Sequence, residues 1–220
     1  MSSLLRLEAV RVAIQGAEIL RDITFSVPRG GLVALVGRNG AGKTTTLRAV
    51  MGLLPLAHGQ ISMEGADLEQ VPAFQRARQG IGYVPEDRRL IGRLTVNDNL
   101  LLPVWMHKGA HASQRLAFVY RLIPELEALS ERKAAQLSGG QQKMVALARA
   151  LISATKLLLL DEPFEGLSPG LGEKLAAIIR EVQRSEVSVL IAESDVKRVG
   201  FIEEIYKIER GEMVRNVGTG

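Results

Sequence analysis

The chain has no cysteine among its 220 residues. This absence excludes a disulfide framework and any metal site built on thiolates, and it is typical of a protein that works in the cytosol. Long hydrophobic runs are missing too, because no window holds about 18 uninterrupted apolar residues, as a membrane-spanning helix requires. Arg6 and Glu8 interrupt the start of the chain, which argues against a signal peptide. We therefore expect a cytosolic chain with no membrane span and no secretory leader.

A strong excess of charge of one sign is also missing. The 28 Lys and Arg against 24 Asp and Glu give a formal net charge of +4. The basic residues are scattered, with small clusters at residues 88–93 and 132–133. Scattered charge is typical of a solvated surface, so we expect no nucleic-acid partner. With 46% hydrophobic residues, the chain is long enough for one unit with a sizeable core.

Apolar, β-rich segments alternate with helical segments along the chain. Continuous runs of Val, Ile and Leu between helices are typical of a parallel sheet that is covered on both faces. The first thirty residues alternate more and favour antiparallel strands, so we expect an α/β fold with a helical insert. The expected strands are residues 32–37, 60–64, 81–86, 156–163 and 187–194; the expected helices are 43–54, most of 95–153 and 171–185; and 201–218 form a closing hairpin around Arg210 and Gly211.

The segment GRNGAGKT, residues 37–44, fits the phosphate-loop pattern G-x-x-x-x-G-K-[ST], with a strand before it and a helix after it. Glycines let successive N–H groups point at phosphate oxygens, and the helix start adds its positive end. We expect Lys43 to reach the β- and γ-phosphates and Thr44 to bind Mg²⁺. A glycine-rich turn that matches by chance is the alternative. The expected phosphate-binding residues are Gly37, Arg38, Asn39, Gly40, Ala41, Gly42, Lys43, Thr44 and Thr45.

A second segment, LLLLDEP, is a hydrophobic strand that ends in Asp161 and Glu162. Ligands of doubly wound sheets lie beyond the carboxyl ends of the strands, which places these acids beside the phosphate loop. Asp161 is expected to hold Mg²⁺, and Glu162 is expected to orient or deprotonate an attacking water. The alternative is a strand-ending turn that Pro163 stops.

A third segment, LSGGQ, residues 137–141, lies about twenty residues before LLLLDEP at the start of a helical run. Ser138 can cap that helix and build a second anion site, or it can be a plain N-cap. The order of the three motifs resembles the ATP-binding cassette (ABC) ATPases, in which the serine-glycine motif is the family signature. The resemblance covers the whole chain.

The resemblance implies a P-loop NTPase core of the RecA-like kind, with an antiparallel β subdomain and a helical subdomain that carries the signature. It implies one ABC ATPase domain over residues 1–220, whose core is 1–86 and 157–220 and whose helical subdomain is roughly 87–156. ATP and Mg²⁺ are the implied cofactors. In this family two cassettes pair head to tail, a closed two-fold arrangement. By resemblance, the partner's γ-phosphate is then capped by Ser138, Gly139, Gly140 and Gln141.

Several positions differ from the common pattern of the family. Glu86 of YVPED stands where a glutamine is usual, and a carboxylate there can still serve Mg²⁺. Ser194 stands where a catalytic histidine is usual, and Glu193 or Asp195 is the alternative for its role. The aromatic residue that stacks on adenine is replaced by Ile14 and Gln15. The segment GLSP, residues 166–169, matches the family's contact with the partner cassette.

The sequence around Glu86, EPFEGLSP and the histidine-free AESD resembles the ATP-binding subunits of branched-chain and related hydrophobic amino-acid importers. The implied partners are a second cassette, identical or homologous, and separate permease subunits, which would place the chain on the inner face of the membrane. A soluble ABC ATPase of nucleic-acid repair or translation, or a weakly hydrolysing regulatory module, is the alternative.

His107 and His111 have the i,i+4 spacing of zinc ligands, but Gly109 lies between them, and we expect no metal site beyond Mg²⁺.

Overall fold

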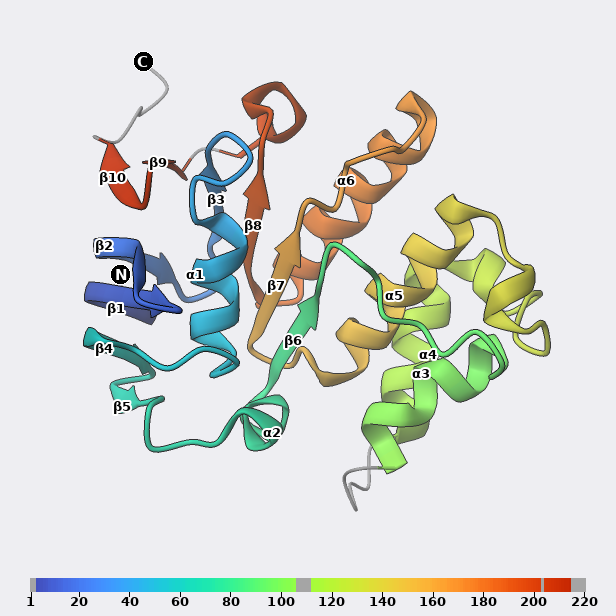
Figure 1. Cartoon of the computed structure of the whole chain (residues 1–220). Coiled ribbons are helices and arrows are strands. Elements are labelled where there is room, and N and C mark those ends of the chain that lie inside the picture. The colour runs from blue at the N-terminus through green and yellow to red at the C-terminus, as the bar shows by residue number, and fades with distance from the viewer. Residues whose placement is uncertain (1–2, 106–111, 203, 215–220) are drawn as a thin grey trace.

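A six-stranded sheet runs through the centre of the computed structural model, which describes residues 3–105, 112–202 and 204–214 (Figure 1). The strand order is β10-β9-β3-β8-β7-β6, and every pair is parallel except β10 with β9. The predicted parallel sheet is confirmed. Its strands are β3 (Leu32–Val36), β6 (Ile81–Val84), β7 (Leu157–Asp161), β8 (Ser188–Glu193), β9 (Glu204–Glu209) and β10 (Glu212–Val214).

A second, antiparallel sheet is built from the first part of the chain. Its strand order is β2-β1-β4-β5, and each neighbouring pair is antiparallel. This confirms the antiparallel strands that the alternating first thirty residues predict. The strands are β1 (Ser3–Ile14), β2 (Ala17–Pro28), β4 (His58–Met63) and β5 (Ala66–Asp67).

Helices cover both faces of the six-stranded sheet. The helix after the phosphate loop packs on the face toward the antiparallel sheet, and α5 and α6 pack on the opposite face (Figure 1). The helices are α1 (Lys43–Val50), α2 (Ala73–Arg76), α3 (Val96–Trp105), α4 (Ala112–Leu122), α5 (Gly139–Ser153) and α6 (Pro169–Arg184), with 3₁₀ turns η1 (Ala77–Gln79), η2 (Pro124–Leu126), η3 (Ala134–Gln136) and η4 (Val196–Val199).

The central strands contribute alternate side chains to two hydrophobic cores. In β7, Leu157 and Leu159 belong to the core with α1 and the antiparallel sheet, whereas Leu158 and Leu160 belong to the core with α5 and α6. All four leucines are fully buried. Because neither face of this strand meets water, its sequence is a continuous apolar run without alternation.

The ends of two helices differ from the expectation. α1 ends at Val50 rather than at residue 54, and Gly52 then turns the chain at a φ of 68°. α6 begins at Pro169 rather than at residue 171, because proline lacks an N–H and its fixed φ suits the first helical turn. The hairpin around Arg210 and Gly211 is confirmed, and its first strand also joins the central sheet beside β3.

The short helix α2 is absent from the expected elements, yet its Arg76 supports α1. The Arg76 side chain is 5% exposed. Its guanidinium donates to the carbonyl oxygens of Ala49 and Val50, at the end of α1, and of Leu68 and Val71, over distances of 2.5 to 3.1 Å. Arg76 thus caps the C-terminus of the helix that begins at the phosphate loop.

We predict that Arg76→Met lowers the free energy of unfolding by about 2–4 kcal/mol, because several buried carbonyl groups lose their donor while the apolar stem is kept. Urea denaturation followed by circular dichroism measures the change. Arg93→Met, at an exposed position, is the control and should change stability by less than about 0.5 kcal/mol. Equal stability of the two variants would contradict the capping role.

Candidate functional site

The phosphate loop lies between β3 and α1 and needs its glycines for distinct reasons. Gly40 and Gly42 have φ values of 79° and 112°, in the region that side chains disfavour. A Cβ on Gly37 would lie 2.2 Å from the carbonyl oxygen of Ile208 on β9. The loop is therefore held against β9, the last parallel strand. The first amides of α1 follow the loop directly and have no hydrogen-bond partner within the helix.

Lys43, the first residue of α1, folds its side chain back over the loop. Its ammonium group donates to the carbonyl oxygens of Gly37 (2.7 Å) and Arg38 (3.3 Å). It also lies 3.0 Å from Oε1 of Glu162, in an ion pair whose two side chains are 5% and 8% exposed. The structure thus brings together the lysine and the acid that the sequence analysis assigned to binding and to chemistry.

Asp161 ends β7 and faces the start of α1. Its Oδ1 accepts the Thr44 hydroxyl at 3.0 Å, and its Oδ2 accepts the Tyr83 hydroxyl at 3.3 Å. Burial raises the pKa of Asp161 to about 6, although both hydrogen bonds act in the opposite direction. A cation at this carboxylate would offset the cost of burying its charge. Sequence analysis missed Tyr83, although its place on β6, two residues before Pro85, puts it at the same sheet edge.

The Thr44–Asp161 pair fits Mg²⁺, which prefers oxygen ligands and commonly takes one or two carboxylates together with phosphate oxygens and water. Within the described ranges, no group of three or more His, Asp or Glu side chains could hold a metal alone. An ion here would therefore need ligands from a bound nucleotide. Glu86 is exposed and lines, with Thr44 and Asp161, a cavity of about 640 Å³.

Glu162 follows Asp161 and has a φ of 48°, which is unfavourable for a residue with a side chain. Its backbone N–H donates to the carbonyl oxygen of Ala192 at 2.9 Å. Its Oε2 accepts the hydroxyl of Ser194 at 3.1 Å and the N–H of Ser194 at 3.2 Å. Burial disfavours the charge on Glu162, but hydrogen bonds with Lys43, Glu193 and Ser194 outweigh burial and lower its pKa.

Glu193, the last residue of β8, is fully buried beside Glu162. Its Oε1 accepts the N–H of Phe164 at 3.0 Å, and its Oε2 lies 3.5 Å from Nη1 of Arg198. Burial raises the pKa of Glu193 to about 7, and its contact with Glu162 acts in the same direction. The signal that finds Asp161, an acid at the carboxyl end of a buried parallel strand, also applies to Glu193.

The signature residues lie apart from the phosphate loop. Figure 1 places the start of α5 among the helices on one side of the sheet, away from the loop between β3 and α1. Ser138 Oγ accepts the N–H of Gln141 at 3.3 Å, and the Gln141 side chain accepts the N–H of Ser138 at 2.9 Å. This reciprocal pair is a capping box. Ser138 and Gly139 are exposed, and Gly140 and Gln141 are half-buried.

The remaining predicted positions have varied surroundings. Arg38, Asn39 and Gly40 are exposed on the loop, Ala41 is buried, and Thr45 is half-buried on α1. Ile14 is 38% exposed at the end of β1, and Gln15 follows it at a φ of 51°. His107 and His111 lie outside the described residues.

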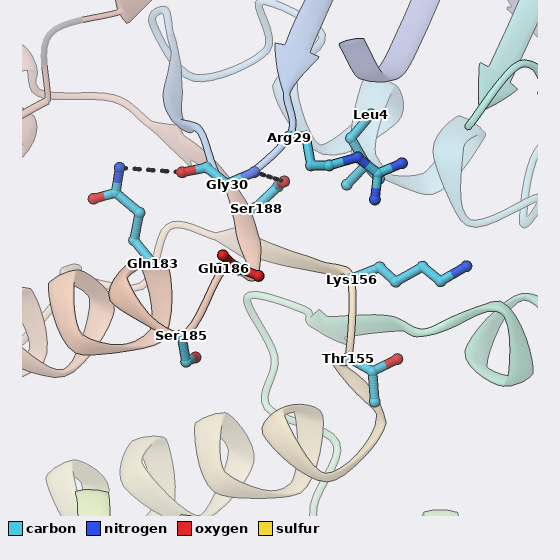
Figure 2. A pocket seen from close by; sticks show the side chains of 9 residues that line it. All are labelled: Leu4, Arg29, Gly30, Thr155, Lys156, Gln183, Ser185, Glu186 and Ser188. Atoms are coloured by element: carbon cyan, nitrogen blue, oxygen red, sulfur yellow. Dashed lines mark hydrogen bonds between the residues drawn. The ribbon is translucent and has the colours of Figure 1, made fainter. Parts of the chain in front are cut away.

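A cavity of about 670 Å³ lies at the opposite end of the central strands (Figure 2). Its polar groups bond to one another: Ser188 Oγ accepts the N–H of Gly30 at 2.9 Å, and Gln183 donates to the carbonyl oxygen of Gly30 at 3.3 Å. The cavity is lined by Leu4, Arg29, Gly30, Thr155, Lys156, Gln183, Ser185, Glu186 and Ser188. No residue of the predicted site is among these lining residues.

In the part of the chain that the structure describes, no helix combines the length and apolarity needed to cross a bilayer.

Known proteins resemble this chain in sequence and in structure. Residues 20–165 match the family model described as ABC transporter. The chain is 36% identical over 198 residues to the high-affinity branched-chain amino acid transport ATP-binding protein BraG of Pseudomonas aeruginosa, a match over 90% of this chain and 85% of BraG. It is 35% identical over 205 residues to the lipopolysaccharide export system ATP-binding protein LptB of Escherichia coli K12, over 92% of this chain and 85% of LptB.

Two solved structures have closely similar folds. The ADP conformation of MJ1267, an ATP-binding cassette of an ABC transporter, has a TM-score of 0.87 at 25% identity, over 100% of this chain and 92% of that chain. A dimeric post-hydrolysis state of the cassette MJ0796, bound to ADP and Pi, has a TM-score of 0.87 at 25% identity, over 98% of this chain and 99% of that chain.

Proposed function

Because this chain belongs to the ABC transporter family and is an ATP-binding, ATP-hydrolysing subunit of such a transporter, we propose that it drives the uptake of branched-chain or related amino acids or amides through a separate permease. The observation that carries the catalytic part is the continuous set of contacts from Thr44 through Asp161 to the ion pair of Glu162 with Lys43. These contacts gather a phosphate loop, an oxygen donor set and a buried base at one sheet edge.

The phosphate loop is the proposed ATP site. The amides of the loop and of the first turn of α1 would bind phosphate oxygens, and the Lys43 ammonium would bind the β- and γ-phosphates. Thr44, Asp161 and Glu86 would hold Mg²⁺, which supplies charge neutralisation for the phosphates when it is bound. Ile14, 38% exposed at the end of β1, is the proposed apolar support for the adenine at the position where an aromatic residue is usual.

Glu162 is the proposed general base. Its carboxylate, which accepts the N–H and the hydroxyl of Ser194, can accept a proton from an attacking water. Ser194, which donates to Glu162 Oε2, would hold the carboxylate in place. The Lys43 ammonium lies 3.0 Å from Glu162 Oε1. A phosphate that binds this ammonium would break the ion pair, and Oε1 would then be available to the attacking water.

The signature would act on the ATP of a second cassette. Ser138 and Gly139 are exposed at the N-terminus of α5, and the capping box holds the first amides of this helix in an ordered turn. The dimeric MJ0796 structures support a paired arrangement. Residues 87–156, the proposed helical subdomain, would carry the closing motion to the permease on the inner face of the membrane.

Substitution of Glu162 by Gln tests the catalytic role. We predict that ATP affinity is kept while turnover falls about 10²–10³-fold, because the amide is nearly isosteric but cannot accept the proton. Steady-state phosphate release and isothermal titration with ATP measure the two quantities. Glu165→Gln, at an exposed position in the following loop, is the matched control and should hydrolyse like the parent. Turnover at the parent rate in Glu162→Gln would exclude Glu162 as the base.

Action of the signature in trans is tested by mixing two inactive variants. Ser138→Arg fills the space meant for the partner's γ-phosphate, and Lys43→Ala removes the ammonium of the phosphate loop. We predict that a 1:1 mixture recovers up to about a quarter of the parent turnover, because half of the dimers contain one chain of each variant. In such a dimer, one of the two ATP sites combines an intact phosphate loop from one chain with an intact signature from the other. Replacing Lys43→Ala in the mixture with the double variant should abolish this recovery. Mixed dimers without recovered turnover would exclude action in trans.

The transported solute is tested in cells of the source organism. We predict that deleting the gene lowers uptake of labelled leucine, isoleucine or valine at least about tenfold, because the permease would lose a cassette that each of its ATP sites needs. The parent gene should restore uptake, and the Glu162→Gln variant should not. The similarity to LptB, at 35% identity, favours lipopolysaccharide export as the second candidate. Unchanged uptake with a loss of lipopolysaccharide at the cell surface would favour that candidate instead.

A further inference from the structure

The segment that follows β6 has an unusual backbone. Arg88 and Arg89 have φ values of 60° and 47°, so two consecutive residues with side chains adopt the left-handed conformation. Residues other than glycine seldom adopt it even singly, and it persists only where surrounding groups hold the chain in place. The N–H of Arg88 also donates to the carbonyl oxygen of Pro85 at 3.1 Å, which closes a turn over residues 85–88. We therefore looked for groups outside the segment that hold this turn.

Arg149, in the second half of α5, supplies that support. Its Nη1 donates to the carbonyl oxygen of Arg89 and its Nη2 to that of Arg88, each at 2.8 Å. One planar guanidinium thus binds both left-handed residues at once. Its chain neighbours Ala148 and Ala150 are buried in the core between α5 and the central sheet. The helix is therefore a fixed support for the turn.

A second attachment to α5 comes from the side chain of Arg88. Its Nη1 donates to Oε1 of Gln142 at 3.2 Å. Gln142 in turn donates to the carbonyl oxygens of Ala134 (3.1 Å) and Leu137 (3.3 Å), just before the helix begins. The turn is thus joined to α5 by two separate sets of hydrogen bonds, one to its backbone and one to a side chain.

The turn carries Glu86, the proposed third ligand of Mg²⁺. Glu86 is the second of the four residues of the turn, and it lines the cavity of about 640 Å³ together with Thr44 and Asp161. β6 fixes the chain before the turn, and Arg149 fixes the two residues at and after its end. The position of the Glu86 carboxylate therefore depends on both supports.

We propose that Arg149 is a positioning residue for Glu86: by binding the carbonyl groups of both left-handed residues, it holds the turn in the conformation that keeps the Glu86 carboxylate at the wall of the Mg²⁺ site. The inference rests on the proposed role of Glu86 as a Mg²⁺ ligand. Its chemical requirement is a pair of donors in a fixed planar geometry, which arginine has and lysine lacks.

Trypsin reports the state of the turn without any ligand, because cleavage after Arg88 or Arg89 requires the segment to open. In the full-length protein, Arg149→Met should be cleaved there at least about tenfold faster than the parent, since both carbonyl groups lose their donor. Mass spectrometry of the early fragments identifies the cleaved bonds.

Arg115→Met is the matched control. Arg115 is also half-buried, and it donates to the carbonyl oxygens of residues 151, 152 and 154 at the C-terminal end of the same helix rather than to those of the turn. Its substitution should lower stability and leave cleavage after Arg88 and Arg89 within about twofold of the parent. A general loosening of α5 is thereby separated from release of the turn.

Mg²⁺ gives the second readout, through isothermal titration with a non-hydrolysable ATP analogue. The quantity is the gain in affinity for the analogue that Mg²⁺ produces. Arg149→Met should reduce this gain about 3–10-fold, while the affinity without Mg²⁺ changes less than about twofold. Glu86→Ala should reduce the gain to a similar extent. A general defect of the fold would weaken both affinities instead.

Glycine provides a suppressor of the Arg149 variant. Arg89 is exposed and pairs with Asp87, and glycine adopts its φ of 47° without the cost that a side chain carries. Adding Arg89→Gly to Arg149→Met should therefore recover at least about threefold in the Mg²⁺ gain and in resistance to cleavage after Arg88, each measured against Arg89→Gly alone. Arg149→Lys should be cleaved at least about threefold faster than the parent, and it provides the test if Arg149→Met fails to fold.

Parent-like cleavage or a parent-like Mg²⁺ gain in the Arg149 variant, or no recovery when Arg89→Gly is added, overturns the inference. Glu86→Ala in the same titration tests the proposed function separately. If Glu86→Ala reduces the Mg²⁺ gain and the Arg149 variant does not, only the positioning role is wrong. If Glu86→Ala keeps the parent gain, Glu86 is not a Mg²⁺ ligand, and the role of Arg149 is overturned with it.

Discussion

The buried ion pair of Lys43 with Glu162 is the constraint on which the site depends. It joins the first residue of α1 to the residue after β7, with both side chains at most 8% exposed. Removing one partner of such a pair commonly costs about 3–5 kcal/mol, because the other charge is left buried and unpaired. A ligand that binds the Lys43 ammonium must therefore be negatively charged, because it replaces Glu162 as the partner of that ammonium. Other groups must then stabilise the negative charge of Glu162. Phosphate meets the first condition, and the donors at the end of β8 meet the second.

The two hydrophobic cores hold the side chains of the site at fixed positions relative to one another. β7 and β8 are buried on both faces, so their carboxyl ends are fixed relative to each other and to β3, which leads into the phosphate loop. Arg76 fixes the far end of α1. The helix that carries Lys43 and Thr44 is thus held at both ends, and the site has rigid support except at the exposed tip of its loop.

Much of this arrangement follows from the sequence because it depends on local pattern. A few consecutive residues encode each continuous apolar strand, the phosphate loop and the acids at the end of β7. Because the carboxyl ends of parallel strands lie at the same end of the sheet, the loop and the acids are predicted to lie together. The side-chain partners are not encoded in this way. Tyr83 reaches Asp161 across 78 positions, and Arg76 reaches α1 from an element without an apolar pattern. The parallel pairing of β9 with β3 also depends on contacts far apart in the chain.

The four leucines of β7 have a consequence for how this strand finds its alignment. Because identical side chains face both cores, moving the strand by one position would exchange leucine for leucine and leave the apolar packing almost unchanged. The interior carries no information that distinguishes one alignment from the next. That information comes from the charged residues at either end: Lys156 comes before the strand, Asp161 is its last residue, and Glu162 follows it. The acids that serve chemistry thus also mark where the strand must stop.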